Sequence, residues 1–368
     1  MDFSNDTRTV FTLDAGGTNY VFTAIKGCEK VGAQITLPAE ANDLDKSIAN
    51  IKRGFKMLAE CTNSKPSAIS FAFPGPADYE NGVIFNIGNI PAFAGGVALS
   101  NILQDEFKIP VFINNDGDLF AYGESMAGAL PIINNQLKEY NNPKRYKNIF
   151  GITLGTGLGG GFVIDGKLYT GDNSNASEIW LMKNKFNATS FAEEAACIRA
   201  VQKSYAKYAQ IDDYKKYSPK DIEDIALGTI SGDIDAAKKA YQELGEALGD
   251  VLCEIIRITD SIIVIGGGLS YGHKLFMPSL MREMNAQIQN TEGSPFPKLV
   301  QKVYNLEDLQ QLKDFATGGV KEIKVYGSNK TVLATSEKRI GVCISKLGTS
   351  NAVAIGAYTF ALNKLDNK

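Results

Sequence analysis

Residues 10–25 read VFTLDAGGTNYVFTAI, and this stretch fixes the first part of the fold. An apolar run, Val10–Leu13, leads into Asp14 and a glycine pair, and a second apolar run, Tyr20–Ile25, follows at once. Two apolar runs joined by a short glycine turn predict a β-hairpin. Glycine in such a turn lets backbone N–H groups approach an anion closely.

The same pattern returns 141 positions later. Residues 153–157 read TLGTG, and Gly161-Phe162-Val163 takes the place of the second apolar run. A third buried strand, Ser261–Ile265, also ends in glycines, at 266–268. A repeat of about half the chain predicts two related α/β domains with a site between them.

The second glycine loop, 155–160, reads GTGLGG and matches the G-x-G-x-x-G pattern. A dinucleotide site needs a helix directly after that loop, but FVIDGK follows and indicates a strand and a turn. The chain also has no G-x-x-x-x-G-K-[ST] segment. A nicotinamide-dependent oxidoreductase is therefore disfavoured, and a P-loop NTPase is excluded.

Composition narrows the chemistry further. Lys plus Arg is 38 and Asp plus Glu is 41, a net charge of −3, which gives no whole-chain footprint for nucleic acid or anionic membrane. One histidine, His273, and five cysteines without a C-x-x-C pair argue against a Cys/His zinc cluster and a disulfide scaffold. No G-x-S-x-G lies near His273. We expect the chemistry to rest on carboxylates, backbone amides and a bound cofactor or nucleotide.

The expected location is the cytoplasm. The first ten residues are polar and do not form a signal peptide, and the strongest apolar runs are too short to cross a bilayer. The odd cysteine number favours a reducing compartment.

Along the chain, helical spacing alternates with short apolar runs. Helices are predicted at 48–61, 97–107, 119–128, 191–209, 234–257 and 351–362, and further strands at 68–73 and 111–113. Residues 130–147 are polar and contain Asn141-Asn142-Pro143, which suggests a linker or surface excursion. Residues 291–340 look irregular, apart from a strand pair near 321–326 and 330–334.

Taken in order, several segments resemble sugar kinases of the ROK family (repressors, open reading frames and kinases), in the actin/hexokinase-like superfamily. The matching segments are LDAGGTN at 13–19, FPGPADYENG at 73–82, NIPAF at 89–93, INNDGDLFAYGE at 113–124, TLGTGLGGGFVIDGKL at 153–168, NASE at 175–178, VIGGGLS at 264–270 and AIGAY at 354–358. They extend over nearly the whole chain, so the resemblance is specific.

The resemblance implies a two-domain α/β fold of the actin-like ATPase type, a duplicated ribonuclease H-like unit with an interdomain cleft. We expect an N-terminal domain of residues 1–117 plus a returning helix at 351–368, and a larger C-terminal domain at 118–350. The segment 291–340 is longer than in typical relatives and has no assigned role. The family also suggests a homodimer.

The implied reaction transfers the γ-phosphoryl group of ATP to a hexose hydroxyl, mainly by positioning and charge stabilisation. Asp116 matches the family's general base, and Asn115 matches a residue that binds sugar hydroxyls. A carboxylate at a strand end can take the hydroxyl proton, although an Asp there can also be a helix N-cap. Asp118 is the rival carboxylate.

On the nucleotide side, Asp14 matches the residue that holds Mg²⁺, through water, since Mg²⁺ keeps much of its hydration. Asn19 stands where many relatives carry a basic residue. The resemblance assigns phosphate or adenosine contacts to Gly16, Gly17, Thr18, Thr156, Gly157, Gly267 and Gly268.

On the sugar side, Gly75 and Asn89 match pocket-lining positions, and Glu178 matches the glutamate of the family's E-x-G-H motif. Here that motif reads Glu178-Ile179-Trp180-Leu181, so the histidine that relatives use for sugar and zinc is missing. The usual cysteine-rich segment is also absent, and we expect no structural zinc. Glu193 fits the next sugar-binding glutamate of the family. Trp180 is predicted either to stack on a sugar face or to fill the core.

Glucose is the default substrate, with N-acetylated hexosamines as the alternative, because loss of a hydroxyl-binding donor alters discrimination. A non-catalytic sugar-binding or regulatory protein of the same fold is a second alternative. A sugar-responsive repressor is disfavoured, because 13 residues before Asp14 leave no room for a helix-turn-helix.

Overall fold

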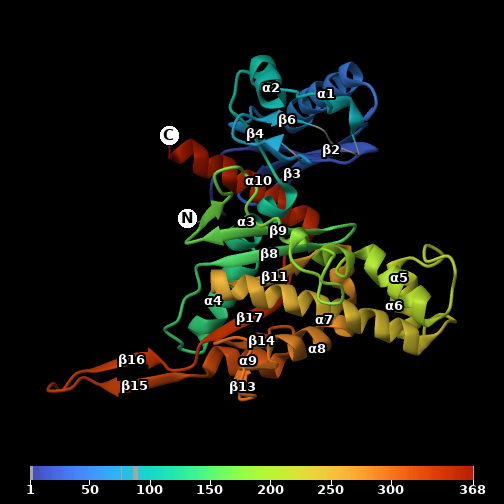
Figure 1. The fold of residues 1–368 in the computed structure, drawn as a ribbon. Helices are drawn as coiled ribbons and strands as arrows, with labels where there is room; N and C mark the ends of the chain where they lie inside the picture. The colour runs from blue at the N-terminus through green and yellow to red at the C-terminus, as the bar shows by residue number, and fades with distance from the viewer. Residues whose placement is uncertain (1–2, 76, 86–89, 368) are drawn as a thin grey trace. The chain divides into compact units, whose positions relative to one another are not determined.

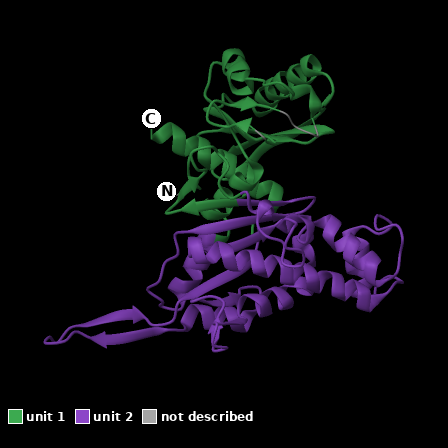
Figure 2. Cartoon of the chain, in the orientation of Figure 1, with its two compact units in different colours: residues 1–129, 161–177, 346–368 green, residues 130–160, 178–345 purple. Residues whose placement is uncertain are grey.

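The computed structural model describes residues 3–75, 77–85 and 90–367 (Figure 1). Contacts within the chain divide it into two compact units, coloured separately in Figure 2. Unit 1 consists of residues 1–129, 161–177 and 346–368, and unit 2 of residues 130–160 and 178–345.

Unit 1 is built on a five-stranded sheet with the order β3-β2-β1-β4-β7. The predicted hairpin is confirmed, since β1 and β2 pair antiparallel with Asp14 opposite Val21. Strands β4 and β7 extend the sheet in parallel with β1. The strands span Val10–Ala15 (β1), Asn19–Lys26 (β2), Glu29–Pro38 (β3), Ala68–Ala72 (β4) and Val111–Asn114 (β7).

Helix α1 covers this sheet with its apolar face. Asp43 begins the helix as N-cap, and its side chain accepts a hydrogen bond from the Lys46 backbone N–H. The apolar face places Phe55 edge-on to Phe22 at 5.0 Å and against Phe71 at 6.2 Å. The remaining elements before residue 116 are α1 (Leu44–Thr62), the short pair β5 (Ala77–Asp78) and β6 (Val83–Ile84), η1 (Pro91–Phe93) and α2 (Leu99–Phe107).

Two glycines bring α3 (Asp116–Met126) and α10 (Thr349–Asp366) into close contact. A Cβ at Gly356 would lie 1.9 Å from the Leu119 carbonyl oxygen, and one at Gly123 would lie 2.0 Å from that of Ala352. Beyond this crossing, α10 buries Tyr358 and Leu362 in the core beneath β1.

Because of these contacts, the residue bounds of the two units differ from those of the predicted domains. The predicted boundary at residue 118 falls inside α3, which packs on α10 and stays in unit 1. Residues 161–177 also belong to unit 1, because Gly161 lies directly on the start of α3, where a Cβ would be 2.3 Å from the Gly117 carbonyl oxygen.

The second sheet has the order β10-β9-β8-β11-β17-β14. Its parallel strands lie in unit 2: β8 pairs with β11, β11 with β17, and β17 with β14. Residues 158–160 of β9 belong to unit 2, and the rest of β9 pairs with β10 in unit 1. The strands span Ile149–Leu154 (β8), Leu158–Ile164 (β9), Lys167–Tyr169 (β10), Ile262–Gly266 (β11), Lys302–Asn305 (β14) and Arg339–Ile344 (β17).

The two sheets share one plan, in which strands of a glycine hairpin are followed by parallel strands. The predicted duplication is therefore visible in the strand order.

Long helices cover the sheet of unit 2. The longest is α7, where Gly245 and Gly249 allow a close approach of α8: a Cβ at Gly245 would lie 2.2 Å from the Phe276 carbonyl oxygen. The helices of this part are α4 (Ala129–Glu139), η2 (Ile179–Leu181), η3 (Ala192–Glu194), α5 (Ile198–Tyr208), α6 (Pro219–Ala226), α7 (Ile234–Thr259), η4 (Gly268–Gly272), α8 (His273–Met284) and α9 (Leu309–Thr317).

Two sequence predictions need correction here. Residues 130–147 are not a plain linker, because α4 buries Leu130, Ile133 and Leu137 at helical spacing. The segment 291–340 is more ordered than predicted, since it contains β14 and α9. The predicted strand pair is confirmed as β15 (Val320–Lys324) and β16 (Thr331–Thr335), which extend as a two-stranded ribbon (Figure 1). A second short hairpin joins β12 (Gln287–Gln289) and β13 (Pro295–Pro297).

Among the described residues, no helix combines the length and the apolar character that a membrane crossing requires.

Candidate functional site

The first glycine loop closes the β1–β2 hairpin of unit 1. The Gly16 N–H donates to the Asn19 carbonyl at 3.1 Å, and the Ala39 N–H donates to the Thr18 carbonyl at 3.0 Å. Residues 16–19 are exposed, as is Asp14 at the end of β1. The predicted phosphate residues Gly16, Gly17 and Thr18 thus lie together on an open turn beside a carboxylate.

Asp116 is the first residue of α3, directly after β7. The cap of this helix is Asn115, whose side chain accepts a hydrogen bond from the Gly117 N–H at 2.8 Å. The N-cap interpretation of Asp116 is therefore wrong, although its Oδ1 also accepts from Gly117 N–H at 2.9 Å. Asp116 is exposed, whereas the rival Asp118 is only 4% exposed.

The sheet of unit 1 brings Asp14 and Asp116 close to each other. Strands β1, β4 and β7 run parallel, so the residues at their carboxyl ends meet at one edge. The pKa of Asp14 is raised, first because surrounding protein displaces water from the carboxyl, although the residue itself is exposed, and second because the Asp116 charge repels it. Lys30 opposes this shift.

Two predicted sugar residues of unit 1 follow β4. Gly75 is exposed, and a Cβ there would lie 3.1 Å from the Tyr79 hydroxyl, which donates to the Phe73 carbonyl at 3.0 Å. Asn89, the second of them, lies outside the described residues.

In unit 2 the two remaining glycine loops meet. The Gly155 N–H donates to the Gly157 carbonyl at 3.0 Å and closes the turn that carries Thr156. Gly267 has a φ of 89°, and a Cβ there would lie 2.3 Å from the Leu154 carbonyl oxygen, so only glycine fits. Gly268 faces open space. The predicted phosphate and adenosine loops are therefore neighbours at the ends of β8 and β11.

Glu193 holds the second glycine loop from η3. Its Oε2 accepts a hydrogen bond from the Leu158 N–H at 3.0 Å, and a Cβ at Gly157 would lie 2.6 Å from the same oxygen. Its Oε1 lies 3.6 Å from the Arg199 guanidinium. No spacing signal in the sequence pointed to this contact, because it joins positions 35 residues apart.

Glu178 and Trp180 form a second local pair. The Trp180 indole N–H donates to the Glu178 carboxylate, and the indole packs edge-on to Phe191 at 5.6 Å. Trp180 is half-buried, so it neither fills the core nor stands free. Leu181, the residue at the histidine position of the E-x-G-H motif that the resemblance implies, is 58% exposed.

Cys197 is buried, and desolvation raises the pKa of its thiol, which disfavours the thiolate that binds metal. Within the ranges that the structure describes, no three His, Cys, Asp or Glu side chains are grouped to hold a metal ion. The absence of zinc stays a prediction.

Two sheets of shared strand order, each with a glycine hairpin at a strand end, define the class of the protein as an actin-like ATPase fold. The chain belongs to the ROK family, whose model matches residues 10–305.

Three relatives illustrate the family. A glucokinase from Parabacteroides distasonis is 47% identical, with a TM-score of 0.91 and 99% of each chain covered. A ROK family glucokinase from Streptomyces griseus, solved in complex with glucose and AMPPNP, shares the fold at 16% identity and a TM-score of 0.60, covering 95% of this chain and 98% of that one. The xylose repressor of Bacillus spizizenii is 26% identical over 55% of this chain, and the match spans 49% of the repressor.

Proposed function

We propose that this protein is an ATP-dependent glucokinase, which transfers the γ-phosphoryl group to a hydroxyl of glucose. The observation that carries the proposal is the pair of neighbouring carboxylates, Asp14 and Asp116, on a chain 47% identical to a glucokinase over 99% of its length. A protein that only bound sugar would have no need to hold two like charges together against their repulsion.

Asp116 is proposed as the general base. Its exposed carboxylate stands at the first turn of α3, and Asn115 is the N-cap of that helix. Oδ1 of Asp116 accepts from the Gly117 N–H, and Oδ2 is proposed to contact the substrate hydroxyl. As the hydroxyl oxygen bonds to phosphorus, Asp116 accepts its proton. Asn115 is proposed to bind a neighbouring sugar hydroxyl.

Asp14 is proposed to hold Mg²⁺ through water. The donor set fits, because exposed carboxylate oxygens suit this hard cation, and a cation would relieve the repulsion that raises the pKa of Asp14. Bound Mg²⁺ would neutralise charge that builds up on the phosphates. The backbone N–H groups of Gly17 and Thr18, in the same exposed turn, would donate to the phosphates.

Residues of unit 2 are proposed to bind the nucleotide. The turn at Thr156 and Gly157 offers phosphate donors, and Gly267 and Gly268 provide a surface without side chains for the adenosine. The fit rests on the open space at Gly268 and on the close packing that fixes Gly267 on Leu154.

In unit 2, Glu178 is proposed to bind sugar hydroxyls. The Trp180 indole N–H orients its carboxylate, in place of the missing histidine. We propose two roles for Glu193. One is the predicted contact with the sugar, and the other is support of the second glycine loop, through the hydrogen bond that it accepts from the Leu158 N–H. Gly75 and Asn89 complete the proposed sugar residues. Because the histidine of the family motif is missing, an N-acetylated hexosamine remains the second candidate substrate.

We propose a cytoplasmic location, where ATP is available and the five cysteines, none of which forms a disulfide among the described residues, stay reduced. A homodimer without zinc is proposed from the family resemblance.

A coupled ADP-release assay with Mg-ATP tests the function across hexoses and N-acetylhexosamines. We expect turnover with glucose, and a lower kcat/KM with N-acetylglucosamine. Turnover that is highest with an N-acetylated sugar would move the assignment to a hexosamine kinase. Sugar binding by calorimetry without ADP release from any sugar would instead support the non-catalytic alternative.

A further inference from the structure

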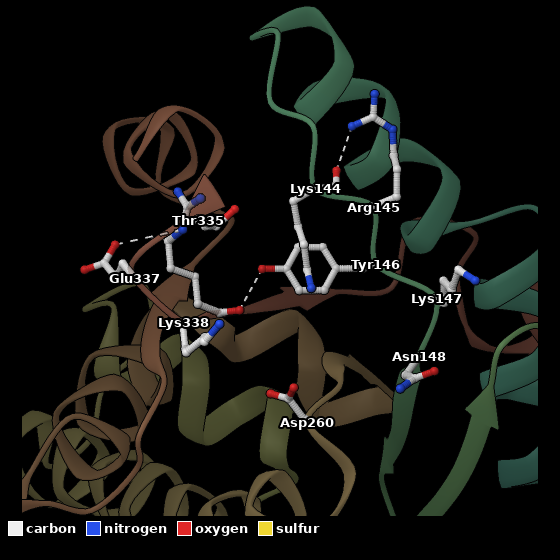
Figure 3. Close-up of a pocket in the computed structure, with 10 residues that line it drawn as sticks. Lys144, Arg145, Tyr146, Lys147, Asn148, Asp260, Thr335, Glu337 and Lys338 are labelled. Carbon is white, nitrogen blue, oxygen red and sulfur yellow. Dashed lines mark hydrogen bonds and ion pairs between the residues drawn. The ribbon is translucent and has the colours of Figure 1, made fainter. Parts of the chain in front are cut away.

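The parallel strands of unit 2 begin beside a cavity of about 400 Å³ (Figure 3). It is lined by residues 144–148 before β8, Asp260 before β11, and residues 335 and 337–339 at the start of β17. The glycine loops lie at the opposite ends of these strands. Since a strand rises roughly 3.3 Å per residue, the six residues of β8 separate the cavity from Gly155 by about 20 Å.

Positive charge collects in this cavity. Its lining carries two carboxylates, Asp260 and Glu337, against five cationic side chains, Lys144, Arg145, Lys147, Lys338 and Arg339. The chain as a whole is slightly negative, so this excess is local and does not follow from composition.

The two carboxylates already have partners. Glu337 Oε2 accepts a hydrogen bond from the Tyr304 hydroxyl at 3.0 Å, and its Oε1 lies 4.0 Å from the Lys302 amine. Asp260 accepts a hydrogen bond from the Gln301 side chain at 2.6 Å. By contrast, no described carboxylate lies within 4.0 Å of the charged nitrogens of three of the cations, which are Lys144, Arg145 and Lys338.

Arg339 adds a buried charge. Its side chain is 2% exposed, and Nη1 donates to the carbonyls of Phe315 and Asp314. Its Nε has no hydrogen-bond partner among the described residues, and the nearest carboxylate, Glu337, lies 3.9 Å away. A buried guanidinium with an unfilled donor is costly unless negative charge compensates it.

Tyr146 connects several parts of the wall that carries these charges. The Tyr146 hydroxyl donates to the Arg339 carbonyl at 2.7 Å, and its ring stacks on Phe315 at 5.5 Å. The Lys144 amine lies over the same ring at 5.2 Å (Figure 3). Positioned cations lose little freedom when they bind an anion.

We propose that this cavity is a second binding site, separate from the nucleotide loops, for a small phosphorylated molecule. Its volume suits a ligand the size of a sugar phosphate or a mononucleotide, and Lys144, Arg145 and Lys338 are cations without a carboxylate partner that can donate to phosphate oxygens. Nη1 of Arg145 already donates to the carbonyls of Asn142 and Lys144, so its other N–H groups would contact the phosphate. The site does not depend on the proposed kinase activity.

Calorimetric titration of the full chain tests the site with four probes: inorganic phosphate, pyrophosphate, glucose 6-phosphate and AMP. The variants are R145E and K338E, with K321E as the control, because Lys321 is an exposed lysine of β15 in the same unit outside the cavity. We expect R145E and K338E each to weaken binding of at least one probe by about tenfold or more. K321E should bind within twofold of the wild type, and added NaCl should weaken the binding.

The probe that binds tightest identifies the phosphate source, and unchanged melting temperatures and unchanged kcat show that the variants fold. Binding of every probe that is equal in R145E, K338E and the wild type would overturn the proposal, as would no binding at all. A single-stranded RNA oligonucleotide forms a further arm: binding of RNA alone, lost in K338E, would overturn the small-molecule assignment in favour of a nucleic-acid surface.

Discussion

The two glycine hairpins occupy equivalent places in the two sheets but work with different side chains. In the first, Asp14 ends β1 and lies near Asp116, so the turn carries negative charge. In the second, Gly155 stands at the repeated position of Asp14, and the turn is instead held by Glu193 through the Leu158 N–H at 3.0 Å.

The difference shows that two copies of one turn can differ in charge and so suit different ligands. A carboxylate at the first turn suits a cation, while the second turn has no charge of its own and, under the proposed function, would present backbone donors to an anion. Support from Glu193 fixes the shape of the second turn, which glycines alone would leave loose.

The largest effect is expected near the first hairpin, where Asp14 and Asp116 lie close together. D116N should lower kcat by about a thousandfold, because the hydroxyl proton loses its acceptor. ADP release measures the rate, and nucleotide binding with an unchanged melting temperature shows an intact fold. D105N, an exposed carboxylate of α2, is the control. Full activity in D116N would remove Asp116 from the mechanism.

The next effect concerns Asp14 and pH. Because the pKa of Asp14 is raised, its carboxylate is lost at a higher pH than an ordinary Asp as the solution is acidified, and Mg²⁺ binding is lost with it. D14N should raise the Kd for Mg²⁺ by about tenfold or more at neutral pH.

In D116N the repelling charge is gone, so the acid loss of Mg²⁺ binding should move to lower pH. Calorimetry with Mg-AMPPNP measures this across a pH series. The same midpoint in D116N and wild type would show that the two carboxylates do not interact.

A smaller effect is expected at the second hairpin, which Glu193 supports. E193A should raise the KM for ATP by about tenfold, because a charge-assisted hydrogen bond to the loop is lost, and E193Q should do less because its amide oxygen can still accept. E194Q, at a neighbouring ion-paired glutamate, is the control. A rise confined to the KM for glucose would assign Glu193 to the sugar alone.

Gly157 gives a matched test of the same contact. G157A should weaken ATP binding, because its Cβ would meet Glu193 Oε2 at 2.6 Å, and E193A should relieve part of that penalty. A double-mutant cycle measures the coupling. Strict additivity would mean that the contact does not shape the loop.

The smallest effect is expected at Trp180. W180F keeps the edge contact with Phe191 but removes the N–H that orients Glu178, so the KM for glucose should rise about fivefold while kcat and the KM for ATP stay unchanged. Steady-state kinetics separate these parameters. An equal loss in all three would indicate a general structural role.

The hairpins and glycine loops could be predicted because strand pairing across a short turn is a local property of the sequence. Helix α4 was missed, since Asn134, Asn135 and Pro131 hide an apolar face of three buried residues. The candidate site residues were predicted from the family motifs, and their roles stay predictions. The Glu193 contact and the Glu178–Trp180 pair were not predicted, because they depend on the side-chain placement of residues at short 3₁₀ turns, which have no periodic signal.

Helix α10 also sets an order of synthesis. Unit 1 needs α10 to cover α3 and the underside of β1, at contacts so close that two glycines are required. Every residue of unit 2 has a number below 346, so on the ribosome its chain is complete before α10 emerges. A complete core around the strands and helix that carry Asp14 and Asp116 therefore requires α10, which is synthesised after every residue of unit 2.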